Sequence, residues 1–199
     1  MVSTDLSPKA AEIAACAQSL LATRGYNGFS YADISEAVRI SKASIHFHFP
    51  SKAELVQTVL KRYREQGRVG LAAMEKQIAD PLARLHAYTG YWAACIRDGT
   101  APFCICAMLG SELSAIPEPV ADEVRGHFRD LGIWLAGVLE EGATKGIFRL
   151  RTDPESEAAA LMATVHGSML AARVCGDPEV FATIVQQGVK QLLAPTPQQ

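Results

Sequence analysis

The stretch Ser41–Lys52, SKASIHFHFPSK, decides how this chain folds. Its apolar residues Ile45, Phe47 and Phe49 alternate with histidines, which is the period of a half-buried β-strand. A lone strand would leave its backbone N–H and C=O groups unpaired, and no other segment has convincing strand flanks. We therefore interpret residues 42–48 as a short helix with Ile45 and Phe49 one turn apart on its buried side. Its other side then carries Lys42, Ala43, His46 and Phe47.

The residues before this stretch predict another short helix. Ser30 is a helix-capping residue type, and Ile34 and Val38 follow it at the spacing of one helical turn. Only the short connection "RIS" separates this helix from residues 42–48. Two short helices joined in this way, the second with a polar face, form a helix-turn-helix, which places its second helix in the major groove of DNA.

Helical signals continue through the rest of the chain, so the predicted fold class is all-α. A first helix is bounded by Ser7-Pro8 and Gly25, and a long helix runs from Ser51 towards Asp80. Further helices are expected over residues 104–115 and 119–146. Asp-Pro pairs combine an N-cap carboxylate with a pre-set first residue. Such pairs open three more helices, at Asp80-Pro81, Asp153-Pro154 and Asp177-Pro178.

Composition and charge limit the classes of protein to which the chain can belong. With 199 residues, 49% of them hydrophobic and 20% charged, it is a globular protein of one or two domains. No apolar run approaches the roughly 20 residues of a membrane span, and we expect a cytoplasmic protein with no membrane partner. Residues 1–65 carry eight Lys/Arg and six Asp/Glu, whereas residues 66–199 carry eleven and fifteen. This asymmetry permits a basic DNA-binding part on an acidic body.

The segment Gly28–Val56, GFSYADISEAVRISKASIHFHFPSKAELV, resembles the DNA-binding segment of the TetR family of bacterial transcriptional repressors. The resemblance lies in the order and spacing of a Ser cap, an Ile-Ser pair, a three-residue turn, a Lys-Ala-Ser start, an aromatic-His-Phe run and a Ser-Lys-Ala-Glu start. It covers about 45 residues with the first helix, and the remainder matches in helix number and length. Two positions depart from the family pattern. Arg39 occupies the position of the family's turn glycine, where a positive φ costs a residue with a side chain about 1 kcal/mol. His46 occupies the position of the family's phosphate-binding tyrosine.

The resemblance, together with side-chain chemistry, predicts which residues contact DNA. Lys42, Ser44 and Phe47 are placed for base edges, Lys42 for guanine acceptors and Phe47 for a thymine methyl. Lys52 begins its helix, where its ammonium and the backbone N–H groups can hold a phosphate. The predicted DNA-binding set is Ser30, Tyr31, Ser41, Lys42, Ala43, Ser44, His46, Phe47 and Lys52.

The predicted domains are a helix-turn-helix domain over residues 1–50 and a helical effector-binding and dimerisation domain over 51–199, connected by the helix 51–80. Proteins of this kind act as homodimers on palindromic operators. The family resemblance implies that the helices Pro119–Gly146 and Pro154–Cys175 pair with their symmetry mates; the alternative is that their apolar stripes are internal core only. Small residues that would permit close contact are Ala158, Ala159, Ala163, Gly167, Ala171 and Ala172.

The segment Gly99–Ala115, GTAPFCICAMLGSELSA, carries two of the five cysteines. A thiol at a helix start feels the positive helix end, which lowers its pKa, so we expect Cys104 or Cys106 to react as thiolate. The segment also resembles, more loosely, the electrophile-sensing N-ethylmaleimide reductase repressor type. That resemblance matches its reactive thiol to Cys104 and its lysine to Arg173. Buried inert thiols are the alternative, and a metal site would need a third ligand that the spacing does not supply.

A non-covalent effector pocket is the other possibility for the larger domain. An apolar cavity between helices would bind a small molecule and need no cofactor. Its predicted lining is Tyr88, Trp92, Met108, Trp134, His166 and Met169, with Phe103 and Met162 nearby.

These features predict a dimeric DNA-binding repressor that leaves its operator when a small apolar or electrophilic effector acts. An enzyme is disfavoured, because no motif assembles a nucleophile, base and orienting acid, and no phosphate-binding glycine loop is present. A helical dimeric scaffold or an enzyme with a degenerate DNA-binding motif remains the alternative, since Arg39 and His46 depart from the pattern.

Overall fold

The structure, a computed structural model, describes residues 6–101 and 103–195. Within these residues nine α-helices and one short 3₁₀ helix make up the regular structure, and no β-strand occurs. An isolated antiparallel bridge joins Phe148 to Leu193. The predicted all-α class is confirmed.

Most helices begin and end at the predicted local signals. Helix α1 (Pro8–Arg24) starts after Ser7, whose hydroxyl accepts the Ala10 N–H, and stops at Gly25 with φ 72°. Each Asp-Pro aspartate also caps its helix by accepting a backbone N–H bond. These three helices are α5 (Pro81–Asp98), α8 (Pro154–Cys175) and α9 (Pro178–Leu192). The other helices start within about one residue of the predicted positions: α2 (Tyr31–Val38), α3 (Lys42–His48), α4 (Lys52–Gln77) and α7 (Glu118–Thr144).

The predicted continuous helix over residues 104–115 is wrong. Helix α6 covers only Ile105–Gly110, and a separate 3₁₀ helix covers Leu113–Ala115. The break is made by tight turns, in which the N–H of Ser111 donates to Met108 O at 3.3 Å and that of Glu112 to Leu109 O at 3.0 Å. Such bonds to the third preceding carbonyl end an α-helix and reorient the chain.

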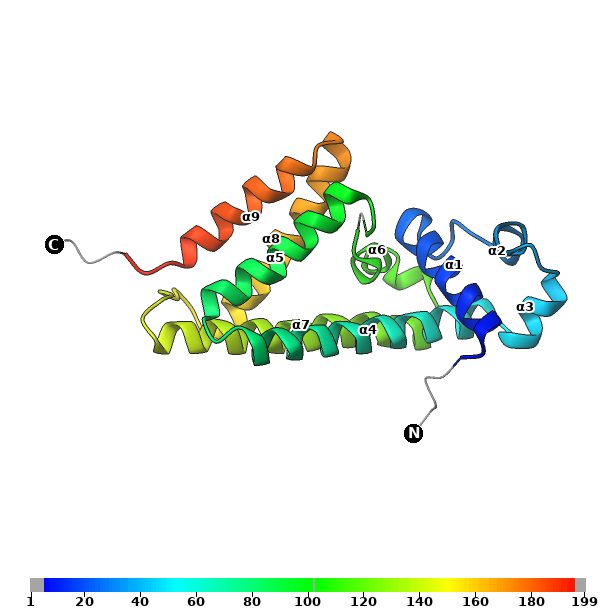
Figure 1. Ribbon diagram of the computed structural model, residues 1–199, viewed down its shortest axis with the longest axis horizontal. Helices are drawn as coiled ribbons and strands as arrows, with labels where there is room; N and C mark the ends of the chain where they lie inside the picture. The colour runs from blue at the N-terminus through cyan, green and yellow to red at the C-terminus, as the bar shows by residue number, and fades with distance from the viewer. Residues whose placement is uncertain (1–5, 102, 196–199) are drawn as a thin grey trace. The chain divides into compact units, whose positions relative to one another are not determined.

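The described chain divides into two compact units. Among the described residues, the first unit comprises 6–67 and 103–128, and the second comprises 68–101 and 129–195. In the first unit α1 packs against α2, α3 and α6 (Figure 1). Its core is fully buried and aliphatic, built around Ile13, Leu21, Ile34, Ile45, Leu55 and Leu60.

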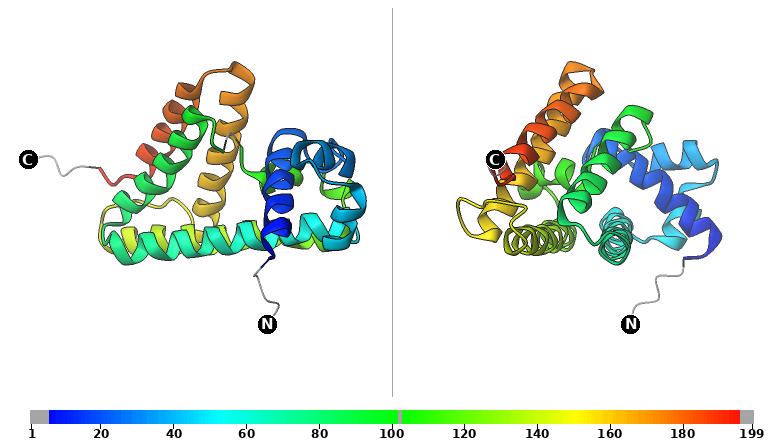
Figure 2. Two further views of the ribbon diagram at one scale, coloured as in Figure 1. Left: turned by 45° about the vertical axis from the view of Figure 1, so that its right-hand side comes forward. Right: turned by 60° about the vertical axis from the view of Figure 1, so that its left-hand side comes forward.

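In the second unit α9 packs along α8 and against α5, and these three helices lie side by side in all views (Figure 2). Their core includes Leu85, Met169 and Phe181, none of which is accessible to solvent. The guanidinium of Arg84 is buried and forms a two-pronged ion pair with Glu141 on α7, with N–O distances of 2.6 and 3.1 Å. Buried charge is tolerated here because its N–H groups are bonded to the carboxylate and to the carbonyls of Ile78 and Ala79.

Helix α8 is exceptional in its apolarity. By length and composition it could cross a membrane, although 33% of its most apolar window is buried within the protein. Core helices of globular proteins share this length and composition, so α8 alone does not indicate a membrane span.

Candidate nucleic-acid interface and effector core

The turn between α2 and α3 is built around Arg39. Arg39 has φ 56° and ψ 47°, and it is the one non-glycine residue with positive φ in residues 6–101 and 103–195. The N–H of Ile40 donates to Ser35 O at 3.2 Å, and the Ser35 hydroxyl donates to Ile40 O. The chain therefore reverses in three residues, as predicted, and a side chain occupies a left-handed position that glycine would occupy without strain.

Helix α3 has one buried side and one exposed side. Ile45 is 0% and Phe49 4% exposed, so both anchor the helix in the first unit as predicted. Phe47, in contrast, is 83% exposed. Apart from an edge-on contact with the His48 ring, with centroids 5.2 Å apart, the phenyl ring lies in solvent, where another molecule can reach it. It shares the exposed side with Ser41, Lys42, Ala43 and His46, while Ser44 is half-buried.

Two aromatic residues connect α2 to the end of α3. The Tyr31 hydroxyl donates to Phe49 O at 2.9 Å, and burial, followed by the Glu54 carboxylate, raises the pKa of Tyr31 to about 12. The ring of Tyr31 meets the His46 ring edge-on, with centroids 4.8 Å apart. Nδ1 of His46 lies 3.2 Å from Pro50 O. Since the Tyr31 proton is used inside the protein, a phosphate would have to displace the Phe49 carbonyl to receive it.

The predicted serine contacts also have structural roles. Ser30 caps α2, and its hydroxyl donates to Asp33 at 2.8 Å. These bonds from Ser30, together with Arg24, lower the pKa of Asp33. Ser41 caps α3 by accepting the Ser44 N–H at 3.1 Å. The hydroxyls predicted to contact phosphates are the ones that cap these two helices. The DNA contacts of Ser30 and Ser41 therefore remain predictions.

Lys52 lies at the start of α4 but is directed into the first unit. Its ammonium donates to the carbonyl oxygens of Tyr26 and Phe29 and lies 4.6 and 4.2 Å from the centroids of their rings. Burial lowers the pKa of Lys52, and the Glu112 carboxylate opposes that shift. The predicted phosphate contact is thus in competition with an internal role, which holds the turn between α1 and α2.

Cys104 lies in a small cluster that the sequence did not predict. The thiol is fully buried at the start of α6. The Tyr63 hydroxyl donates to its sulfur at 3.5 Å, and Nε2 of His127 lies 3.7 Å from the same sulfur. The rings of Tyr63 and His127 are 5.4 Å apart. The Cys104 thiol therefore has a phenol hydroxyl and an imidazole nitrogen as its polar neighbours.

Cys106 corrects part of the thiol prediction. Burial raises the pKa of Cys106 well above its ordinary value, and its contact with Cys104 adds to that rise. The expected lowering by the helix start is therefore wrong for this residue, because the cost of burying a charge exceeds the effect of a six-residue helix. No group of three His, Cys, Asp or Glu side chains within the described residues is placed to hold a metal ion.

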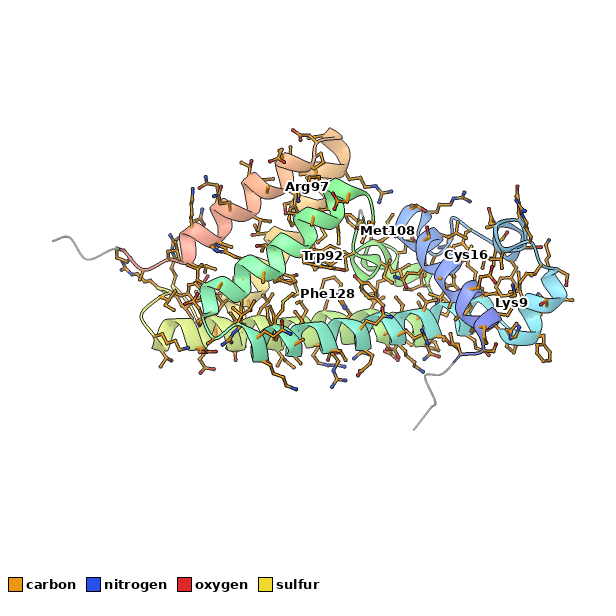
Figure 3. All side chains as sticks on the ribbon, in the orientation of Figure 1. Lys9, Cys16, Trp92, Arg97, Met108 and Phe128 are labelled. Atoms are coloured by element: carbon orange, nitrogen blue, oxygen red, sulfur yellow. The ribbon has the colours of Figure 1, made fainter. Side chains whose placement is uncertain are left out.

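The predicted effector residues divide between the two units. Tyr88, Trp92, Trp134 and Met169 are buried in the second unit, and the Tyr88 and Trp134 rings are 5.7 Å apart. Trp92 lies on α5 and Met108 on α6, which belongs to the first unit with Cys104 and Cys106 (Figure 3). Arg173 lies exposed on α8 in the second unit. The aromatic core thus belongs to the second unit and the thiol cluster to the first.

Buried polar side-chain atoms occur in the second unit. The Tyr88 hydroxyl, Nε1 of Trp134 and Nε2 of His166 are all inaccessible to solvent. The indole N–H of Trp134 has no hydrogen-bond partner among the described residues. A buried donor of this kind is costly unless water or a ligand accepts its hydrogen bond.

Comparison with known proteins identifies the family. Residues 81–187 match the sequence model "Tetracyclin repressor-like, C-terminal domain", and residues 13–59 match "Bacterial regulatory proteins, tetR family". The chain belongs to the TetR family. It is a TetR-family transcriptional regulator with a helix-turn-helix of the DNA-binding type.

Similar proteins agree with this assignment. The crystal structure of a TetR-family transcriptional regulator from Agrobacterium tumefaciens is 49% identical, covers 94% of this chain and 98% of its own, and superposes with a TM-score of 0.92. The HTH-type transcriptional repressor DhaR of Mycobacterium sp. (strain GP1) is 27% identical over 76% of this chain and 75% of its own length. The reduced form of E. coli NemR shares the fold, with a TM-score of 0.84 at 20% identity over 96% of this chain and 100% of its own.

Sequence reasoning missed three contributors to these TetR-family sites. Tyr63 and His127 approach Cys104 from α4 and α7, and Glu112 binds the turn after α1. Gly25 is a signal for the last contact, because a glycine that ends a helix allows another group to approach the backbone closely.

Proposed function

We propose that the chain is a dimeric repressor that binds a palindromic operator through α3 of each copy. The observation that carries this is the two-sided α3, with Ile45 buried and Phe47 83% exposed. A helix anchored from behind, with an apolar ring and a lysine in solvent, matches the needs of major-groove recognition. In this proposal residues 1–50 bind DNA and residues 51–199 bind the effector and the second copy.

Individual side chains have different roles in the proposed complex. Lys42 and Phe47 contact base edges, whereas Ser41, His46 and backbone N–H groups at the starts of α3 and α4 contact phosphates.

The test of these roles begins with DNA duplexes that the protein selects from a random-sequence pool. Phe47→Ala should lose about 5- to 100-fold in affinity for the recovered duplex while leaving the unfolding midpoint unchanged, because its ring is already in water.

Lys76→Ala is the matched control for Lys42→Ala, since Lys76 is an exposed lysine on α4 in the second unit. Lys42→Ala should weaken binding and relax base preference at one position, and Lys76→Ala should do neither. Wild-type affinity should fall steeply with rising salt. A protein that recovers no duplex at any salt concentration would instead support the scaffold or enzyme alternative.

The proposed dimer forms through the exposed side of α8. Ala158 and Ala172 are buried within the second unit, so they do not face a partner. Ala159, Ala163 and Gly167 are exposed, and the same side carries the large apolar residues Leu170 and Val174, which are 53% and 77% exposed. Small residues followed by exposed large ones at helical spacing suit helix–helix contact with a second copy.

Leu170→Glu tests this dimer. Introducing a carboxylate into the paired helices should raise the dimer dissociation constant by at least about 100-fold, measured by sedimentation equilibrium. Cys175→Ser, an exposed position near the end of the same helix, is the control. An unchanged dissociation constant for Leu170→Glu would place the interface elsewhere.

The proposed effector acts on the second-unit core or on Cys104. An apolar molecule with one hydrogen-bond acceptor would satisfy the Trp134 N–H in the aromatic core. A soft electrophile would instead react with Cys104, whose neighbours Tyr63 and His127 favour that second candidate. Operator release assayed with apolar ligands, thiol electrophiles and oxidants, in Cys104→Ser and Cys106→Ser proteins, separates the two. If electrophiles still release the operator from both substituted proteins, the proposed reaction at Cys104 is refuted.

A cytoplasmic location is part of this proposal, because a regulator must reach promoter DNA. The protein is proposed to need no cofactor, and catalysis has no role in it.

A further inference from the structure

The turn between α1 and α2 is bound by a side chain distant in the sequence. The Glu112 carboxylate accepts the backbone N–H of Tyr26 at 3.0 Å. It also accepts the backbone N–H of Asn27 at 3.2 Å and its side-chain amide at 3.1 Å. Three donors converge on one half-buried carboxylate, which is a strong arrangement because the acceptor is charged.

Gly25 makes this approach possible. It ends α1 with φ 72°, and a Cβ built there would lie 1.8 Å from Oε1 and 2.9 Å from Cδ of Glu112. Any other residue would clash with the carboxylate and would also be strained by its backbone. The glycine and the glutamate, 87 positions apart, are therefore parts of one contact.

Lys52 binds the carbonyl oxygens of the same turn. Its ammonium donates to the carbonyl oxygens of Tyr26 and Phe29, while Glu112 accepts from the N–H groups. Three residues separate α3 from Lys52 at the start of α4, so this bond ties the segment that follows α3 to the turn. Within the first unit, the turn is therefore held through its carbonyl oxygens by Lys52 and through its N–H groups by Glu112.

The location of Glu112 gives the contact a regulatory meaning. It follows α6, which is preceded by its N-cap Cys104 and contains Cys106, and α6 packs against α1. The short α6 and the break after Gly110 bring the carboxylate to the turn. A change in the segment 104–112 therefore reaches the DNA-binding helices through a defined set of hydrogen bonds.

We propose that Glu112 is a positioning residue for DNA recognition, which sets the orientation of α1 to α3 by binding the turn at residues 25–28. The inference rests on the proposed DNA-binding function. When this contact is lost, the two copies of α3 in a dimer no longer keep a fixed separation. Affinity for correctly spaced half-sites then falls, and neighbouring spacings are tolerated.

Glu112→Gln tests the proposal. The amide keeps the shape but loses the charge, and its NH₂ group would face backbone donors. The probes are the palindromic duplex that wild-type protein recovers from a random pool, the same half-sites with the spacer changed by one base pair, and a random duplex. We expect about a 10-fold loss of affinity for the palindrome and a broader spacer preference. Affinity for the random duplex and the thermal midpoint should change little.

Glu75→Gln is the matched control, because Glu75 is an exposed carboxylate on α4. Removing a negative charge alone strengthens binding to DNA. A loss of palindrome affinity in Glu112→Gln therefore has the opposite sign to the general electrostatic effect, which Glu75→Gln measures. Glu112→Asp, which is too short to reach all three donors, should behave like Glu112→Gln.

Each other outcome overturns the inference. Unchanged affinity and spacer preference in Glu112→Gln, with wild-type protein binding normally, refutes the positioning role alone. A parallel fall in the thermal midpoint and in binding to both palindrome and random duplex makes Glu112 merely structural. Wild-type protein that binds no duplex refutes the proposed function, and this inference with it.

Discussion

Replacing Arg39 by glycine should stabilise the protein. Arg39 is held at φ 56° and ψ 47°, where a residue with a Cβ is strained by about 1–2 kcal/mol. Glycine removes that strain but gains freedom in the unfolded chain, which costs about 0.4–1 kcal/mol. The two ranges leave a net gain of about 0–1.6 kcal/mol in the free energy of unfolding, centred on about 0.8 kcal/mol. With an unfolding entropy of about 2 cal/mol/K for each of the 199 residues, the central value raises the thermal midpoint by about 2 °C.

The assay is thermal and urea unfolding of Arg39→Gly beside Arg39→Ala, followed by circular dichroism. Alanine removes the guanidinium but keeps the Cβ, so any difference between the two variants reports the backbone alone. Both variants should lose the same amount of affinity for random duplex, because both remove one exposed positive charge. An Arg39→Gly protein no more stable than Arg39→Ala would refute the strain argument.

Two further predictions concern the second unit. Hydrogen bonds to the Glu141 carboxylate, from Arg84 foremost and then from Lys145, lower the pKa of Glu141 from 4.5 to about 2. Its stabilising contribution should be complete above pH about 4.5 and lost as pH falls towards 2, so acid titrations of wild type and Glu141→Gln should converge over that range. Gly142→Ala places a Cβ 2.1 Å from the Phe148 ring and should cost about 1–3 kcal/mol by urea unfolding. Gly137→Ala on the same helix meets no atom within 4 Å and should instead gain up to about 1 kcal/mol.

The prediction of the fold succeeded where the signals are local. Serine caps and Asp-Pro pairs act through backbone N–H groups within three residues, so helix starts follow from the sequence. The short helix 42–48 was predicted for the same reason, since residues 30–52 contain its caps and its buried anchors. The helix over 104–115 failed because its break is made by tight turns that propensity alone does not specify.

The candidate sites were predictable only in part. The exposed side of α3 follows from helical periodicity once Ile45 and Phe49 are placed inside. The neighbours of Cys104 could not be predicted, because Tyr63 and His127 approach it from 41 and 23 positions away. Cys106 shows the same limit, since its pKa depends on burial that only packing determines.

By itself, the sequence determined an all-helical chain with a helix-turn-helix and the side of α3 that faces solvent. Both are consequences of hydrogen bonds and apolar spacing within a few residues. Tertiary structure alone decided that Lys52 binds the carbonyl oxygens and Glu112 the N–H groups of the same turn, and that Gly25 leaves room for the carboxylate. Such contacts join residues far apart in the chain, and their free energy exists only after the helices have packed.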